Sequence, residues 1–203
     1  MVAGLLLAAG AGRRYGMPKA LVRNGERLLV ERALATLRDG GCDPVIVVLG
    51  AAADEVRMRT DLSGATVVLN RDWDSGMGSS LRAGLAALEQ STVDGVCVLL
   101  VDTPGITPSA VRRLAAHSRP AALAIATYGG EPGHPVLLGR DHWTGVADTA
   151  LGDVGARRYL TRHPELVVEV PCDDIAVGTD LDTPPSAPQP LSDPGQRNDL
   201  GAA

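Results

Sequence analysis

The fold is decided near the start of the chain, by the stretch VAGLLLAAGAGRRYGMPK at residues 2–19. Residues 2–7 form a continuous apolar run, which predicts a strand that is buried on both faces. A loop of small residues follows directly and carries three cations, Arg13, Arg14 and Lys19. Such a loop suits a phosphate chain, because glycine lets the backbone amides come close to a ligand.

Short apolar runs alternate with amphipathic stretches along the rest of the chain. Buried strands are expected at residues 2–7, 45–49, 66–69, 96–101 and 123–126, and helices at 26–38, 79–89, 107–116 and 155–162. Thr107 and Pro108 mark the start of the third helix, as a capping residue and a first-turn proline. This alternation predicts an α/β fold of three layers, α/β/α, with a mainly parallel central sheet.

Length and composition favour one globular domain. The chain has 203 residues, of which 45% are hydrophobic, and this is enough to bury one sizeable core. From residue 184 the sequence is rich in proline and has little to bury, so we expect a folded domain over residues 1–183 and a flexible tail over 184–203.

Charge and cysteine content limit the partners and the compartment. A net charge of -5 argues against a surface that neutralises nucleic-acid phosphates or anionic lipids. No apolar run approaches the roughly 20 residues of a membrane span. The three scattered cysteines do not form a disulfide framework or a Cys-x-x-Cys metal site. We therefore expect a cytoplasmic protein with neither a nucleic-acid nor a membrane partner.

The first loop differs from two common phosphate-binding loops. A dinucleotide-binding fingerprint needs glycine or alanine where Tyr15 stands, and a P-loop needs Gly-Lys-Ser/Thr, whereas Lys19 lies between Pro18 and Ala20. Gly10 and Gly12 can admit a triphosphate, which Arg14 and Lys19 would neutralise. A tight turn with solvated cations is the alternative.

Carboxylates form the next candidate group. Asp102 ends the predicted strand at 96–101, where ligands of open α/β sheets bind, and there it could hold a Mg²⁺ that bridges phosphate oxygens. Asp180 and Asp182 would face the same side of an extended segment. A helix-capping or turn aspartate is the alternative at each position.

A further loop leads into the predicted helix at 79–89. Asn70, Gly76 and Ser80 could wrap a ribose or a base there, next to the free amides of the helix N-terminus. The alternative is that Ser79 or Ser80 caps the helix.

Together and in this order, these motifs resemble the MobA-like nucleotidyltransferase family over residues 2–184. The chain is most similar to its molybdenum cofactor cytidylyltransferase branch, whose pattern Leu-Ala-Ala-Gly-x-Ser-x-Arg-Met-Gly-x-x-Lys it nearly repeats. Gly12 replaces the serine and Tyr15 the methionine. Further motifs are Asp-x-Pro at 102–104, Gly-His-Pro at 133–135, Gly-Asp-x-Gly-Ala-Arg at 152–157 and Asp-x-Asp-Thr-Pro at 180–184.

The resemblance implies a Mg²⁺-dependent enzyme that transfers a nucleoside monophosphate from an NTP to a phosphorylated acceptor, molybdopterin, with release of pyrophosphate. A transient contact with a molybdoenzyme or its chaperone would follow. Asp102 and Asp182 would bind the metal, with Asp180 in reserve, and His134, Asp153 and Arg157 would bind the acceptor. The expected nucleotide-binding residues are Leu7, Ala8, Ala9, Gly10, Gly12, Arg14, Lys19, Asn70, Gly76, Ser80 and Asp102, of which Arg14, Lys19 and Asp102 would be catalytic.

CTP is the favoured donor because of Ala9. Guanylyl-transferring relatives usually have glycine at this position, and a methyl group there would take up room that a purine needs. Four alternatives remain: a GTP donor, another phosphorylated metabolite as acceptor, an NDP-sugar glycosyltransferase that uses Asp180 and Asp182, and a nucleotide-binding adaptor without turnover.

Overall fold

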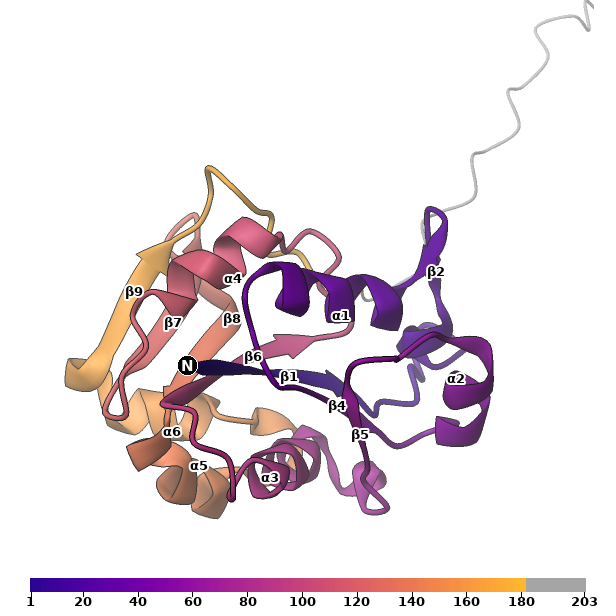
Figure 1. Cartoon of the computed structure of the whole chain (residues 1–203), viewed down its shortest axis with the longest axis horizontal. Helices are drawn as coiled ribbons and strands as arrows, with labels where there is room; N and C mark the ends of the chain where they lie inside the picture. Colours follow the sequence, from indigo (N-terminus) through magenta and orange to yellow (C-terminus); the bar gives the residue numbers. More distant parts are fainter. Residues whose placement is uncertain (182–203) are drawn as a thin grey trace, which may run out of the picture.

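A computed structural model describes residues 1–181 of the chain. Within these residues a central sheet of seven strands lies between two layers of helices. α1 (Leu29–Asp39) and α4 (Pro108–Ala115) lie on one face, and α3 (Met77–Ala87), α5 (Trp143–Thr149) and α6 (Arg157–Arg162) lie on the other (Figure 1). The expected three-layer α/β/α fold is therefore confirmed. Asp182 and the predicted tail at 184–203 lie outside the described residues.

The sheet has the strand order β5-β4-β1-β6-β8-β7-β9. β1 (Val2–Ala8) lies at its centre and runs parallel to β4 (Val45–Leu49) and β6 (Gly95–Leu100), and β5 (Thr66–Leu69) extends this parallel part beyond β4. β8 (Glu131–Gly139) is antiparallel to both β6 and β7 (Leu123–Tyr128), while β9 (Val167–Pro171) is parallel to β7. The sheet is thus mainly parallel, as expected.

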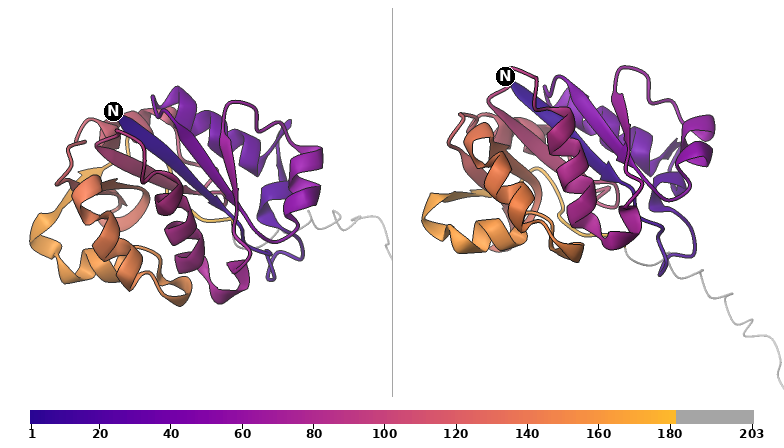
Figure 2. Two further views of the ribbon diagram at one scale, coloured as in Figure 1. Left: turned by 60° about the horizontal axis from the view of Figure 1, so that its bottom comes forward. Right: turned by 90° about the horizontal axis from the view of Figure 1, so that it is seen from below.

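Alternate side chains of β1 contribute to two hydrophobic cores, one on each face of the sheet. Leu6 and Ala8 pack beneath α1 (Leu29–Asp39) and α4 (Pro108–Ala115), whereas Leu5 and Leu7 pack against α3 (Met77–Ala87), α5 (Trp143–Thr149) and α6 (Arg157–Arg162). Figure 2 shows α3 running beside α5 and α6 along one face. The remaining elements are α2 (Ala53–Arg59), the short strands β2 (Arg23–Asn24) and β3 (Arg27–Leu28), and the 3₁₀ turns Lys19–Leu21, Trp73–Ser75, Arg140–His142, Gly152–Val154 and Pro164–Leu166.

Most predicted elements are present, with specific differences. Thr107 caps α4, since its Oγ1 accepts a hydrogen bond from the Ala110 amide at 3.3 Å. The prediction that all five strands are buried on both faces is wrong for β5, where Thr66 and Leu69 are exposed because β5 is an edge strand. β8, β9, α2 and α5 were not among the predicted elements.

The loops that carry the candidate residues meet at one edge of the sheet. β1, β4, β5 and β6 are parallel, so their carboxyl ends lie together, and antiparallel β8 begins at this same edge. The segment 172–181 runs along the edge, because Val177 donates to the Gly105 carbonyl at 3.1 Å and Leu181 to the Asp102 carbonyl at 2.7 Å. Among residues 1–181 no helix is long and apolar enough to cross a membrane.

Candidate active site

An ion pair joins the first loop to the end of β6. The Nζ of Lys19 lies 2.7 Å from Oδ2 of Asp102. The two side chains are only 14% and 20% exposed, so the pair is partly shielded from water but still reachable by a ligand. The structure therefore brings together two of the residues predicted to be catalytic.

The glycine loop turns tightly at Gly12. The amides of Tyr15 and Gly16 both donate to the Gly12 carbonyl, at 2.9 and 2.8 Å. Gly12 has a φ of +60°, and a Cβ there would overlap the carbonyl of Met17. By contrast, a Cβ on Gly10 would meet nothing within 4 Å, so this side of the loop is open to a ligand. Arg14 is exposed on the same loop.

Leu7, Ala8 and Ala9 are buried where β1 enters the loop. The Leu7 carbonyl accepts from the Val101 amide at 3.2 Å, and the Ala9 carbonyl accepts from Ala51 at 2.9 Å. Ala9 is only 5% exposed, and its methyl group packs beside Gly50. Almost none of this methyl group remains to contact a base, so the steric argument against a purine gains no support from the geometry.

Asn70 and Ser80 are buried and bonded to each other. The Asn70 amide nitrogen donates to Ser79 Oγ at 2.8 Å and to Ser80 Oγ at 3.0 Å. Both side chains are buried, at 6% and 3% exposed, and shape the loop from inside. That they contact a nucleotide stays a prediction. The serine-cap alternative is wrong, because α3 begins at Met77 and its N-cap is Gly76.

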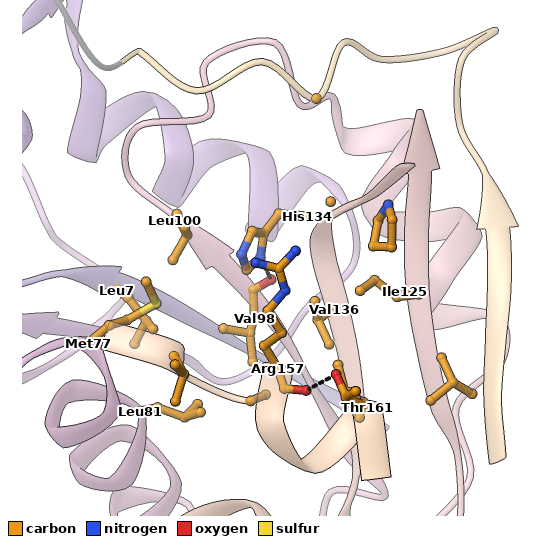
Figure 3. A pocket seen from close by; sticks show the side chains of 18 of the residues that line it. Leu7, Met77, Leu81, Val98, Leu100, Ile125, His134, Val136, Arg157 and Thr161 are labelled. Carbon is orange, nitrogen blue, oxygen red and sulfur yellow. Dashed lines mark hydrogen bonds between the residues drawn. The ribbon is translucent and has the colours of Figure 1, made fainter. Parts of the chain in front are cut away.

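A pocket of about 600 Å³ opens beside this edge of the sheet (Figure 3). His134, Asp153 and Arg157, the three residues predicted to bind the acceptor, all line it, as does Asp180. That they bind an acceptor stays a prediction. Most of the remaining lining is aliphatic and includes Leu7, Met77, Leu81, Val98, Leu100, Ile125, Val136 and Leu160.

His134 is held from two directions. Its Nδ1 lies 3.3 Å from the Val98 carbonyl, which can only accept, so this nitrogen carries the proton. Burial lowers the pKa of His134, although the Val98 hydrogen bond and the charge of Asp102 act in the opposite direction. At neutral pH the ring is uncharged and Nε2 is a hydrogen-bond acceptor. Tyr128 fixes the backbone here, since its hydroxyl donates to the His134 carbonyl at 2.7 Å.

The other two acceptor candidates come from the segment before α6. Arg157 is the first residue of α6, and its side chain extends into the pocket toward His134 (Figure 3). Asp153 lies in a 3₁₀ turn, and its Oδ1 accepts a hydrogen bond from the amide of Met77 at 3.3 Å. The carboxylate of Asp153 thus has a protein partner of its own.

The donor set for a metal is small. Residues 1–181 contain no group of three or more Asp, Glu, His or Cys side chains that could hold a metal ion. Mg²⁺ does not need such a group, since it is usually bound by one or two carboxylates together with substrate phosphates and water. Asp102, at the carboxyl end of β6, fits this mode. Asp180 lies at the same edge, and Asp182 is outside the described residues.

Residues 4–167 match the model of the MobA-like NTP transferase domain. The chain belongs to this family. The matched residues include both Lys19 and Asp102.

Two curated relatives are similar to this MobA-like chain. It is 43% identical over 190 residues to the nicotine blue oxidoreductase of Paenarthrobacter nicotinovorans, covering 90% of this chain and 92% of the relative. It is 32% identical over 145 residues to the molybdenum cofactor guanylyltransferase of Rhodobacter capsulatus, covering 70% of this chain and 66% of the relative.

Solved structures of two mycobacterial proteins are also similar. The rv0371c homolog from Mycobacterium sp. strain JC1 is 37% identical with a TM-score of 0.77, over 90% of both chains. The manganese complex of Rv0371c from Mycobacterium tuberculosis H37Rv is 30% identical with a TM-score of 0.71, over 84% of this chain and 87% of that one. A divalent metal has thus been seen in a structural neighbour.

Sequence reasoning missed the aliphatic lining of the pocket. Its side chains come from separate elements, for example Met77 from α3, Val98 from β6 and Ile125 from β7. In the sequence each of them looks like an ordinary core residue. Only the packing of α3 and α6 over the sheet leaves these side chains around a common space.

Proposed function

We propose that this nucleotidyltransferase moves CMP from CTP to the phosphate of molybdopterin and releases pyrophosphate. The Lys19–Asp102 pair carries the proposal, because it puts a cation and a metal-binding carboxylate within 2.7 Å of each other at the ligand-binding edge of the sheet. The adjoining pocket gives the acceptor a place beside them. The family resemblance supplies the choice of CTP and molybdopterin.

In the proposed reaction an oxygen of the acceptor phosphate attacks the α-phosphorus of the NTP, and the bond to the β-phosphate breaks. Lys19 and Arg14 bind the β- and γ-phosphates and stabilise the charge that builds as pyrophosphate leaves. Arg157 faces the acceptor and offsets its negative charge. The attacking phosphate is already an anion, so no side chain has to remove a proton.

Mg²⁺ is the proposed metal. Asp102 would hold it with Asp182, or with Asp180 instead, and the ion would neutralise phosphate charge during transfer. Lys19 balances the charge of Asp102. Lys19 can then exchange this carboxylate for a phosphate group when the nucleotide binds.

The buried thiols suit a reducing compartment. Cys42, Cys97 and Cys172 are all free and buried. Disulfides are rare in the cytosol, where thiols are kept reduced. We therefore place the enzyme in the cytoplasm, where a molybdoenzyme or its chaperone could receive the product.

The test is pyrophosphate release from CTP, UTP, GTP and ATP, each with Mg²⁺ and with or without molybdopterin. We expect release that depends on molybdopterin and is fastest with CTP. A guanine dinucleotide as the main product would refute CTP as the donor but would leave the nucleotidyltransferase activity in place. GTP is the alternative donor because a molybdenum cofactor guanylyltransferase is among the relatives. Nucleotide binding without any release would favour an adaptor.

A second candidate function is reduction of a ring compound. It rests on the 43% identity, over 90% of the chain, to a protein named nicotine blue oxidoreductase, and on the aliphatic pocket, which suits a flat ring. Against it, the first loop has Tyr15 where a dinucleotide-binding fingerprint needs glycine or alanine. Oxidation of NADH or NADPH by nicotine blue, without pyrophosphate release from any NTP, would establish this function instead.

A further inference from the structure

Helix α3 takes its N-terminal cap from a distant part of the chain. Its own N-cap, Gly76, has no side chain, and no acidic residue lies in its first turn. The amide of Met77 instead donates to Oδ1 of Asp153, which is 76 residues away in sequence. An acceptor at this position satisfies an amide without an intrahelical partner, and its negative charge is favourable at the positive end of the helix.

The backbones around this hydrogen bond are in close contact. A Cβ on Gly76 would overlap the backbone of Gly152, and a Cβ on Gly78 would overlap the carbonyl of Ala150. Arg82 also donates to the Ala150 carbonyl. The first two turns of α3 and the segment 150–153 are therefore packed as one unit.

This unit lies between the two halves of the site. On the nucleotide side the side-chain amide of Asn70 donates to Ser79 and Ser80 of α3. The backbone amide of Asn70 donates to the Leu49 carbonyl of β4 at 2.8 Å. On the acceptor side Met77 lines the pocket.

The chain beyond Asp153 leads directly to the acceptor residue. Gly155 is buried beside Met77, where an added Cβ would lie 3.2 Å from the Met77 sulfur. Arg157 follows two residues later, at the start of α6. The hydrogen bond from Met77 to Asp153 is thus a link between the loop at 70–76 and Arg157.

We propose that Asp153 is a positioning residue that couples nucleotide binding to acceptor binding by fixing the 152–157 segment on the N-terminus of α3. This inference rests on the proposed function for its ligands. It gives Asp153 a role through α3 and Arg157, in place of the direct acceptor contact expected from the sequence. Each ligand orders the shared unit, so each ligand binds more tightly when the other is already bound than when it binds alone.

Asp153→Asn and Asp153→Ala separate the effect of the Asp153 hydrogen bond from the effect of its charge. Asparagine keeps an oxygen that can accept from Met77 but removes the charge, whereas alanine removes both. The dissociation constant of α,β-methylene-CTP with Mg²⁺ is measured with and without molybdopterin. In the wild type and in Asp153→Asn we expect molybdopterin to tighten nucleotide binding by about 5- to 150-fold. In Asp153→Ala the factor falls to near one.

Asp148→Ala is the matched control, since Asp148 is an exposed aspartate on the neighbouring helix α5, and it should behave as the wild type. Equal loss in Asp153→Asn and Asp153→Ala would overturn the inference, because the coupling would then depend on the charge of Asp153 and not on its hydrogen bond to Met77. Undiminished coupling in Asp153→Ala would overturn it as well.

Hydrogen exchange of the ligand-free protein gives a readout that does not depend on the proposed function. Asp153→Ala should speed amide exchange both in 76–81 and in 152–160, and Asp153→Asn should not. If the wild type binds neither CTP nor molybdopterin, the proposed function fails, and this exchange pattern alone decides whether the unit is coupled. Faster exchange confined to 152–160, or no change, would then overturn the inference.

Discussion

Lys19 Nζ and Asp102 Oδ2 lie 2.7 Å apart although 83 residues separate them in sequence. They are brought together because β1 and β6 are neighbouring parallel strands, in register at Leu7 and Leu100, so that the segments leaving both strands start at the same edge. Charge-assisted contacts of this kind are stronger than neutral hydrogen bonds. A phosphate can form the same kind of contact, so it would compete with Asp102 for Lys19.

Lys19→Ala should weaken CTP binding by roughly 10- to 150-fold, since a hydrogen bond to a charged group contributes about 1.5–3 kcal/mol. The measurement is a calorimetric titration of CTP with Mg²⁺. Arg13→Ala is the control, because Arg13 is an exposed cation of the same loop with no assigned role. Equal effects of the two substitutions would show that the loop acts only through its total charge.

Asp102→Asn should lower turnover by about 10²- to 10³-fold, as is typical for the loss of a central charge-stabilising group. The fold should persist, because Leu181 bonds to the backbone carbonyl of Asp102 and not to its side chain. Pyrophosphate release at saturating Mg²⁺ is the measurement. Asp54→Asn, at an exposed residue of α2, is the control. Wild-type turnover in Asp102→Asn would refute the metal assignment.

Gly12→Ala and Gly10→Ala should fail in different ways. Gly12 has a positive φ and its Cβ would overlap the Met17 carbonyl, so Gly12→Ala should lower the free energy of unfolding by about 1–3 kcal/mol. Gly10 has open space, so Gly10→Ala should fold normally yet bind CTP more weakly, because the methyl group occupies the ligand side of the loop. Urea unfolding and CTP titration of both variants check this. Normal CTP binding in Gly10→Ala would exclude this side of the loop from the nucleotide site.

His134, which is partly buried and lines the pocket, should make stability depend on pH. Its pKa in the folded protein is lowered from 6.5, so the unfolded chain binds its proton more readily. The stability that neutral His134 contributes is fully present above pH 6.5. It is lost as the pH falls from 6.5 through the lower pKa of the folded state. His134→Gln should therefore show a smaller decline in the free energy of unfolding than the wild type below pH 6.5, measured by urea unfolding. Parallel declines in both proteins would contradict the assignment of His134 as a neutral histidine with a lowered pKa.

Much of the parallel part of the fold could be predicted because its signals are local. Each of its strands is a continuous apolar run, and Thr107 with Pro108 marks a helix start within two residues. β8 was missed because Gly133 and Pro135 interrupt its apolar pattern, and its pairing with β6 and β7 is antiparallel rather than part of the repeated unit. β9 was missed because it is an edge strand whose Val168 and Glu169 are exposed.

The sequence by itself determined the family and the chemical character of the first loop, because glycine spacing and charge are properties of consecutive residues. Only the tertiary structure decided which of the candidates meet. It pairs Lys19 with Asp102 and buries Asn70 and Ser80 inside the loop. It also brings Asp153 to the N-terminus of α3. A hydrogen bond across 76 residues has no local signal, since it depends on how two separately formed segments pack against the same sheet.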